Sequence, residues 1–322
     1  MTRLCFDVFN GDADGICALH QLRLASPRPG ARLVSGVKRD IALLARVVAE
    51  AAPARAEVTV LDISLDRNRE ALEQLLPACR VLYVDHHHAG DIPEHTHLEA
   101  HINPDPELCT SLIVDQLLDG RFRPWAVAAA FGDNLHGPAR RAAISLGLDE
   151  KKTAALRELG ELFNYNGYGA SVTDLHFDPV ELYRAVSGYT DPWEFCHRSP
   201  VLAILRQGFH DDLEQARSVA PWQETPAGRV WRLPDQSWAR RVSGVFANEL
   251  ARANPEQAHA LLVESADGSF LVSVRAPLAR PRGADTLCRA FPTGGGRAGA
   301  AGINVLPPDQ LGDFRRAFEA AF

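Results

Sequence analysis

The sequence has few lysines and a negative net charge, unlike basic proteins that bind long nucleic acids. Only three lysines occur, at positions 38, 151 and 152, and the formal net charge is −7. A charge of this sign argues against a basic stripe that holds long nucleic acid, although a metal site would supply its own positive charge to a nucleotide. We therefore expect no long duplex as a partner.

Long apolar runs are also missing. The sequence has no run of about eighteen apolar residues, so neither a membrane-spanning helix nor a membrane partner is expected. The first residues, MTRLCFDVFNGDADG, reach acidic positions at once and do not resemble a signal peptide. A cytoplasmic location is the expectation that follows.

The six cysteines are scattered, and no two form a C-x-x-C pair. This spacing disfavours a disulfide framework or a zinc knuckle and predicts reduced thiols, mostly buried as small hydrophobic groups.

What the sequence does have is length and apolar content. Its 322 residues, 46% of them hydrophobic, are enough for two domains with separate cores.

Residues 1–194 predict an α/β domain in which a parallel sheet is flanked by helices, because short apolar runs alternate with helical patterns. Strands are predicted at 3–9, 31–37, 57–64, 80–87 and 97–104, helices at 14–26, at 40–52 and from about 110, and a mainly helical stretch at 125–190.

A composition shift at 219–238, rich in proline and tryptophan, indicates a boundary. We interpret 195–225 as a linker with a connecting helix and 226–322 as a smaller C-terminal α/β domain. Within it the patterns predict helices at 236–253, 283–290 and 308–321, and strands near 259–264 and 269–276.

Polar residues follow the predicted strands at their carboxyl ends, which is where open α/β sheets bind their ligands. Asp12 and Asp14 follow the first strand, Asp62 ends the third, and the segment 85–87 ends the fourth. Because parallel strands end at one edge, these side chains should converge there. Two carboxylates in one space repel each other unless a cation lies between them.

Each motif alone also has a structural interpretation. Asp12, Asp62 and Asp133 could cap helices, and an Asp-x-Asp-Gly segment is also an ordinary turn. The segment DHHH (85–88) is more informative, because the apolar VLYV before it predicts a buried strand, and imidazole is a common metal ligand.

Taken together, NGDADG (10–15), LDIS (61–64), VDHHH (84–88) and FGDN (131–134) resemble the four motifs of the DHH phosphoesterase superfamily. GGGRAGAAGINV (294–305) is similar to the glycine motif of the DHH-associated domain, as in the oligoribonuclease and exopolyphosphatase-like branch. The resemblance implies an active site in a cleft between the two domains. It also implies hydrolysis of a phosphodiester or phosphomonoester bond, in a nucleotide or short oligonucleotide, by metal-activated water.

The resemblance further implies two Mn²⁺ or Mg²⁺ ions, because a ligand set rich in oxygen suits these metals better than zinc. One ion would be held by Asp12 and Asp62, and the other by Asp14, Asp62, His86 and Asp133, with Asp62 shared. Asp85 would orient a histidine, and His87 would face the substrate phosphate; these two are the predicted catalytic residues.

The sequence departs from the family pattern at two positions. Asn10 lies where many members have a histidine, and its neutral amide would be a weaker ligand of the first ion. Arg297 replaces the usual histidine of the glycine motif and could bind a phosphate with two hydrogen bonds. The residues predicted to contact substrate are His87, Ser111, Arg297 and a phosphate-binding loop formed by Gly294, Gly295 and Gly296.

Two other functions stay open at this point. A hydrolase of pyrophosphate or polyphosphate would use the same metals without a base pocket, and a nucleotide-binding module could have lost activity through Asn10. The segment NYNGYG (164–169) could form a loop whose aromatic rings stack on a base. A homodimer is compatible with the sequence but is not indicated by it.

Overall fold

The computed structural model describes residues 4–226 and 228–322, so Arg3, at the start of the first predicted strand, lies outside it. The chain divides into two compact units, Met1–Gln207 and Gly208–Phe322. Each unit has a sheet and a core of its own, which confirms the predicted mixed α/β fold. None of the helices in the described part of the chain is long and apolar enough to cross a membrane.

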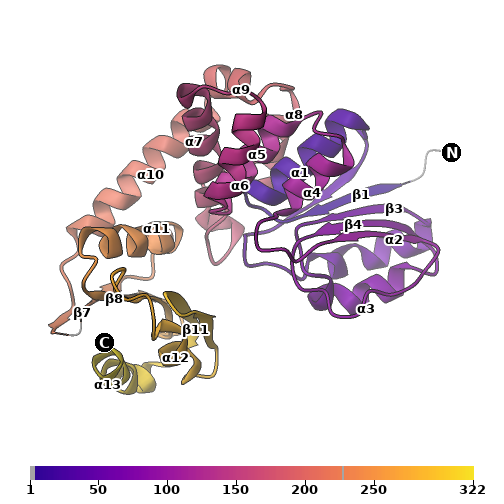
Figure 1. Ribbon diagram of the computed structural model, residues 1–322. Coiled ribbons are helices and arrows are strands. Elements are labelled where there is room, and N and C mark those ends of the chain that lie inside the picture. Colours follow the sequence, from indigo (N-terminus) through magenta and orange to yellow (C-terminus); the bar gives the residue numbers. More distant parts are fainter. Residues whose placement is uncertain (1–3, 227) are drawn as a thin grey trace. The chain divides into compact units, whose positions relative to one another are not determined.

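The first unit is built on a five-stranded parallel sheet of order β2-β1-β3-β4-β5. Its strands are β1 (Cys5–Phe9), β2 (Arg32–Val34), β3 (Glu57–Leu61), β4 (Arg80–Asp85) and β5 (Leu98–Ile102). Alternate residues of the buried strands face opposite sides of the sheet. One side packs on α2 (Val48–Ala54) and α3 (Leu65–Leu75), and the other faces α1 (Ala13–Ala25) and α4 (Thr110–Leu117) (Figure 1).

The strand order places the ends of β1 and β3 where the chain changes direction across the sheet. After β1 the chain crosses to β2 on one side, and it returns to β3 on the other. Leu61 pairs with Phe9 of β1 and with Val84 of β4, so all three strands end at the same level. A crevice at such a switch point is the usual ligand site of a doubly wound sheet.

The rest of the first unit is helical, as the pattern at 125–190 predicts. Its helices are α5 (Arg123–Gly132), α6 (His136–Ser145), α7 (Glu150–Asn166), α8 (Pro179–Ser187) and α9 (Pro192–Arg198), and α10 (Val201–Ser218) crosses into the second unit. Helices α5 and α7 pack very closely through two glycines. A β-carbon at Gly160 would lie 1.8 Å from the Ala128 carbonyl oxygen, and one at Gly132 would lie 2.8 Å from the Gly160 carbonyl oxygen.

The second unit contains a six-stranded sheet of order β10-β11-β9-β8-β7-β6, of which only two strands were predicted. The strands are β6 (Gln223–Thr225), β7 (Gly228–Leu233), β8 (Ala258–Glu264), β9 (Phe270–Arg275), β10 (Gly294–Arg297) and β11 (Ala300–Leu306). Its helices are α11 (Ser237–Ala253), α12 (Ala284–Arg289) and α13 (Leu311–Ala321). Short strands rich in glycine, such as β10, lack the alternating apolar pattern that identifies a strand.

His20 of α1 gives the first unit a pH-dependent stability. The residue is 1% exposed, its Nε2–H donates to the Tyr189 carbonyl at 2.8 Å, and the Trp125 ring lies edge-on at 4.5 Å. Burial lowers the pKa of His20 from 6.5 to about 4. Between pH 6.5 and pH 4 His20 is therefore protonated in the unfolded chain but neutral in the folded protein. The free energy of unfolding decreases as the pH falls through this range.

We expect this group to contribute a loss of about 3 kcal/mol in the free energy of unfolding between pH 7.5 and pH 4. Urea unfolding across this range should show a shallower pH dependence for His20→Gln than for the unaltered protein. Equal pH dependence in the two proteins would contradict a neutral buried imidazole.

Candidate metal centre

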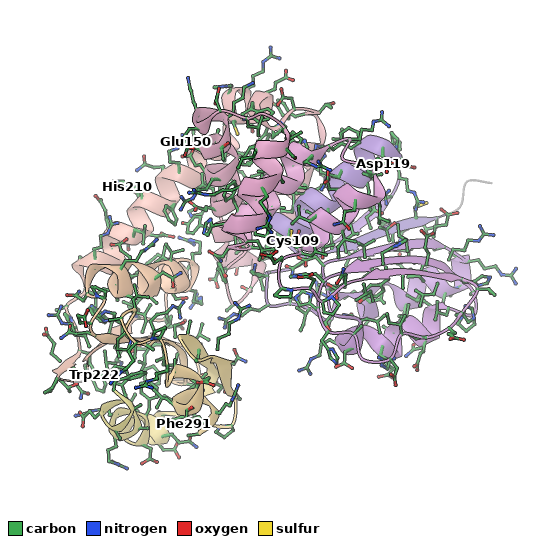
Figure 2. All side chains as sticks on the ribbon, in the orientation of Figure 1. Cys109, Asp119, Glu150, His210, Trp222 and Phe291 are labelled. Carbon is green, nitrogen blue, oxygen red and sulfur yellow. The ribbon has the colours of Figure 1, made fainter. Side chains whose placement is uncertain are left out.

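The acidic and histidine side chains that follow β1, β3 and β4 meet at the carboxyl edge of the first sheet. His86, directly after β4, points Nε2 at Asp62 Oδ1 (3.4 Å), Asp133 Oδ2 (3.6 Å) and Asp14 Oδ2 (4.0 Å). Cys109, labelled in Figure 2, precedes α4, whose first residues complete this region. Four of the six predicted metal ligands therefore lie around one point.

The hydrogen bonds of His86 show why a cation fits that point. Its Nδ1 lies 3.1 Å from the Leu108 carbonyl oxygen, which can only accept, so the proton of a neutral ring sits on Nδ1. The lone pair of Nε2 then faces three carboxylates. This is the arrangement of an imidazole ligand whose second nitrogen is fixed by a carbonyl.

The electrostatics of Asp62 agree with a cation at this point. Asp62 is 2% exposed and accepts from the Thr110 hydroxyl at 3.1 Å. Burial and the neighbouring carboxylates, Asp14 first among them, raise its pKa well above the usual value. Its φ of 59° is left-handed, a conformation that aspartate tolerates and that aims its side chain into the site. The neighbouring carboxylates therefore disfavour negative charge on Asp62.

Asp14 is held by the start of α4. Its two carboxylate oxygens accept the backbone N–H groups of Thr110 and Ser111, each at 2.7 Å. Ser111 is fully buried, and its hydroxyl donates to the Asp14 carbonyl at 2.8 Å. Both donors of Ser111 therefore position Asp14, and its contact with substrate stays a prediction.

Asp12 differs from Asp62 because it already has a cation. One of its oxygens caps α1, accepting from the N–H groups of Asp14 (2.9 Å) and Gly15 (3.1 Å). The other oxygen accepts from Lys38 Nζ at 2.5 Å. Burial raises the pKa of Asp12, but the charge of Lys38 outweighs this and the pKa is lowered. Asp12 is thus both a helix cap and part of the acidic cluster.

Lys38 and Asn164 belong to the centre, and the sequence motifs did not identify either of them. Besides Asp12, Lys38 Nζ donates to Asp133 Oδ1 at 3.0 Å and to Asn164 Oδ1 at 2.8 Å. Burial disfavours the charged amine, yet Asp12 and Asp133 hold its pKa well above the usual value. The rarity of lysine in this chain was the one available signal for Lys38.

Asp85 and His87 form a pair beside the cluster. The His87 Nδ1–H donates to Asp85 Oδ1 at 2.7 Å, and the side chain of His87 is 40% exposed. Burial lowers the pKa of His87, but the hydrogen bond and the charge of Asp85 outweigh it, so the pKa is raised. Asp85 is fully buried and orients this imidazole.

Asn10 is 4% exposed, and its Nδ2 donates to the Lys38 carbonyl at 3.3 Å. Within the described part of the chain its Oδ1 has no hydrogen-bond partner. That oxygen is a neutral donor atom for a cation, whereas the Asp12 carboxylate beside it is already engaged. Asp14, Asp62, His86 and Asp133 thus offer donor atoms for a divalent ion, whereas both carboxylate oxygens of Asp12 already accept hydrogen bonds.

The glycine motif lies in the second unit and is not a loop. Gly294 to Arg297 form β10, which pairs antiparallel with β11. A β-carbon at Gly294 would lie 1.7 Å from the Cys288 carbonyl oxygen, and Gly296 has a φ of 137°. Close packing and a left-handed backbone therefore require these two glycines. Gly295 has no atom near the position of a β-carbon, and Arg297 is exposed.

The segment 164–169, predicted to be an aromatic loop, is a loop only after Asn166. Its first three residues are the end of α7, and Tyr165 is 1% exposed. A ring so deeply buried packs inside the unit and presents no face to a base.

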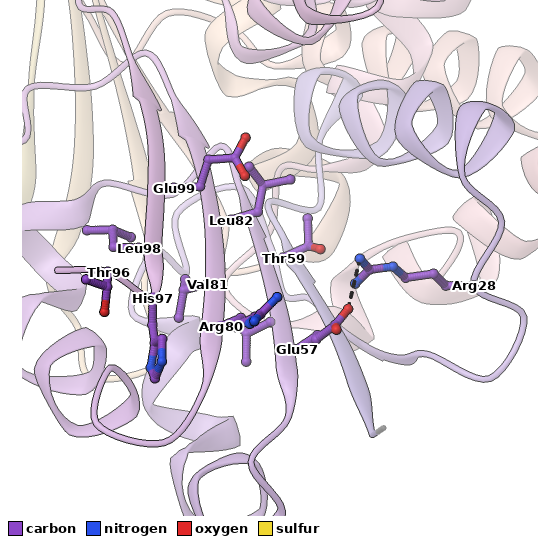
Figure 3. A pocket seen from close by; sticks show the side chains of 11 residues that line it. Arg28, Glu57, Thr59, Arg80, Val81, Leu82, Thr96, His97, Leu98 and Glu99 are labelled. Atoms are coloured by element: carbon purple, nitrogen blue, oxygen red, sulfur yellow. Dashed lines mark ion pairs between the residues drawn. The ribbon is translucent and has the colours of Figure 1, made fainter. Parts of the chain in front are cut away.

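A hollow of about 450 Å³ lies away from the centre, where β3, β4 and β5 begin (Figure 3). Its lining includes Arg80, His97 and the ion pair of Arg28 with Glu57, whose atoms are 3.2 Å apart. Strands of this length separate it from the carboxyl edge by roughly 17 Å. The two groups of side chains that could hold a metal in the described residues, both containing His86, lie at the carboxyl edge.

No family model matches the sequence, and no curated protein matches it. Solved structures do match. The DHH domain of a protein described as a member of a ribosomal protein family has a TM-score of 0.62 at 15% identity, covering 99% of this chain and 86% of that one. Exonuclease RecJ bound to manganese has a TM-score of 0.58 at 18% identity, with 98% and 89% covered.

A third similar structure is the pGpG-specific phosphodiesterase PggH from Vibrio cholerae, with a TM-score of 0.51 at 12% identity. The alignment covers 99% of this chain and 100% of that one. Identities this low carry the fold alone, and that fold is shared along nearly the whole chain. The resemblance found in the sequence motifs is confirmed at this level: the chain has the DHH-domain fold.

Proposed function

We propose that this chain is a metal-dependent phosphoesterase that hydrolyses a phosphodiester or phosphomonoester bond in a nucleotide or short oligonucleotide. The observation that carries the proposal is the convergence of three carboxylates on His86 Nε2 at the switch point of a parallel sheet. The fold shared with an exonuclease bound to manganese and with a dinucleotide phosphodiesterase supports this class of reaction.

In this proposal Asp14, Asp62, His86 and Asp133 hold Mn²⁺ or Mg²⁺. The ion, when bound, supplies positive charge to the phosphate and makes a neighbouring water more acidic. The protein holds the side chains that bind the ion in position before the ion arrives. The α4 N–H groups hold Asp14, the Leu108 carbonyl holds His86, and the left-handed backbone holds Asp62. Ligands fixed in this way need little reorganisation during the reaction.

His87 is proposed to contact the phosphate. Asp85 fixes its Nδ1–H, so the exposed edge with Nε2 is the part of the ring that a substrate can reach. A protonated His87 can donate there to a phosphate oxygen, and this is the role in which Asp85 stabilises it.

Arg297, Gly294, Gly295 and Gly296 are proposed as further substrate contacts. The open space beside Gly295 leaves its backbone accessible, and Arg297 extends an exposed guanidinium from the same strand. We expect Arg297→Ala to raise KM about tenfold with little change in kcat, since one charged hydrogen bond is worth about that much. Arg280→Ala, an exposed arginine before α12, is the matched control and should leave KM unchanged.

The proposal is tested with a panel of substrates in the presence of Mn²⁺. The panel comprises a linear dinucleotide, a cyclic dinucleotide, a nucleoside bisphosphate, pyrophosphate and a p-nitrophenyl phosphodiester. Hydrolysis of one of the nucleotide esters is the expected result. Turnover of pyrophosphate alone would replace the proposal with a phosphoanhydride hydrolase, and binding without any turnover would favour a nucleotide-binding module.

A further inference from the structure

We propose that Lys38 permanently supplies Asp12 with the positive charge expected from a first metal ion, so that the centre combines one divalent ion with one fixed ammonium group. The inference concerns the makeup of the metal centre, and its meaning for catalysis rests on the function proposed above. It is carried by the contacts of Lys38 Nζ, which lies among the carboxylates of the centre.

The ammonium group of Lys38 has three N–H donors and three acceptors. These are Asp12 Oδ2 at 2.5 Å, Asn164 Oδ1 at 2.8 Å and Asp133 Oδ1 at 3.0 Å. A lysine whose three donors are all used by protein oxygens is hydrogen-bonded in place of its water shell. The acceptors come from the start of α1, the end of α5 and the end of α7, so the lysine joins three elements.

The backbone of Lys38 is fixed as well. Its N–H donates to the Gly167 carbonyl at 2.8 Å, and its own carbonyl accepts from Asn10 Nδ2 at 3.3 Å. The Tyr168 ring lies 5.8 Å from Nζ, and the side chain is 23% exposed. Most surface lysines are mobile, whereas these contacts hold this one in a single arrangement.

A second divalent ion has few donor atoms left near Asp12. One Asp12 oxygen is used by the N–H groups of α1 and the other by Lys38. Asn10 Oδ1 is the remaining unpartnered oxygen there among the described residues, and it is neutral. An ion bound beside Lys38 would also be repelled by the ammonium charge, and this repulsion is strong in a buried site.

The charges of the centre are consistent with one ion. Asp12, Asp14, Asp62 and Asp133 supply four negative charges, and Lys38 with one divalent ion supplies three positive ones. The charge that is needed beside Asp12 therefore comes from the chain itself and does not depend on the metal concentration. Lys38 acts here as a positioning residue for Asp12 and Asp133 and as a permanent source of positive charge.

The test is the number of Mn²⁺ ions bound per chain, measured by equilibrium titration and by the electron paramagnetic resonance spectrum at saturation. The unaltered protein should bind one ion and give the spectrum of an isolated Mn²⁺. Lys38→Met removes the ammonium but keeps the bulk of the side chain, so it should bind two ions that give a coupled spectrum. Lys151→Met, at an exposed lysine, is the control and should match the unaltered protein.

Two coupled ions in the unaltered protein would overturn the proposal, because a metal ion would then have displaced the Lys38 ammonium group. One ion in Lys38→Met would also overturn it, because the lysine would not be what excludes the second ion. Hydrolysis with two bound ions would leave the proposed function standing and remove this inference. One bound ion without turnover of any substrate would leave this inference standing and remove the proposed function.

A second measurement on the unaltered protein covers the case in which Lys38→Met does not fold. Reductive methylation followed by mass spectrometry reports separately on Lys38, Lys151 and Lys152, which are all the lysines in the chain. Lys38 should be modified far more slowly than the exposed pair, both without Mn²⁺ and at saturating Mn²⁺. Fast modification of Lys38 once Mn²⁺ is added would show that the ion displaces it, and this would refute the proposal.

Discussion

Replacing Asp62 with asparagine is expected to abolish hydrolysis while making the metal-free protein more stable. Asp62 is buried beside Asp14 and His86, and burial and the neighbouring carboxylates raise its pKa well above the usual value. Asparagine tolerates the same left-handed backbone and keeps a neutral oxygen. Activity should fall by about 1,000-fold, because the ion loses a charged ligand that supports the transition state. The free energy of unfolding should rise by about 1 kcal/mol as repulsion is relieved.

Both effects are measurable in one variant, by Mn²⁺-dependent hydrolysis and by urea unfolding in the presence of a chelator. Asp66→Asn, an exposed aspartate on the following helix, is the control and should change neither quantity. Activity within tenfold of the unaltered protein would rule out Asp62 as a ligand. Destabilisation would show that Asp62 has a favourable partner in the folded protein.

Replacing Gly160 with alanine is expected to destabilise the first unit by about 3 kcal/mol. The added β-carbon would lie 1.8 Å from the Ala128 carbonyl oxygen. Because this oxygen belongs to the backbone of a packed helix, moving it away costs free energy. Overpacking of this kind costs more than the roughly 1 kcal/mol that alanine gains over glycine in a helix. Circular dichroism should show the melting temperature falling by roughly 6–12 °C for a unit of this size.

Gly160→Ala is also expected to disturb the metal centre. Helix α5 ends just before Asp133, and α7 carries Asn164 one turn after Gly160, so forcing the helices apart separates two acceptors of Lys38. Gly244→Ala is the matched control, because this helical glycine of α11 has open space around it. That variant should gain stability. A stable Gly160→Ala protein would mean that α5 and α7 can separate without cost.

The sequence alone was sufficient to predict the first sheet and most of the acidic centre. The five strands of the sheet are short apolar runs with turn residues between them, so a local pattern is enough to find them. Asp62 and His86 follow such strands directly, and the carboxyl ends of parallel strands meet at one edge. The residues of the DHH segment were predictable for the same reason.

The second sheet was predicted only in part. β8 and β9 have apolar or alternating runs, whereas β10 is three glycines and an arginine. A strand of that composition exists because β11 pairs with it and α12 packs against it. Its pairing partners, and not its own residues, decide its structure.

Only the tertiary structure identified what surrounds the acidic residues. Lys38 reaches Asp12 across 26 positions of sequence, Asp133 across 95 and Asn164 across 126. Asp14 takes its hydrogen bonds from residues 96 and 97 positions away. Local patterns locate a residue on its strand or helix, but the pairing of one charge with another depends on how distant elements pack. The sequence therefore determined which carboxylates meet, and the packing of α5 and α7 with the segment that carries Lys38 determined which of them already has a cation.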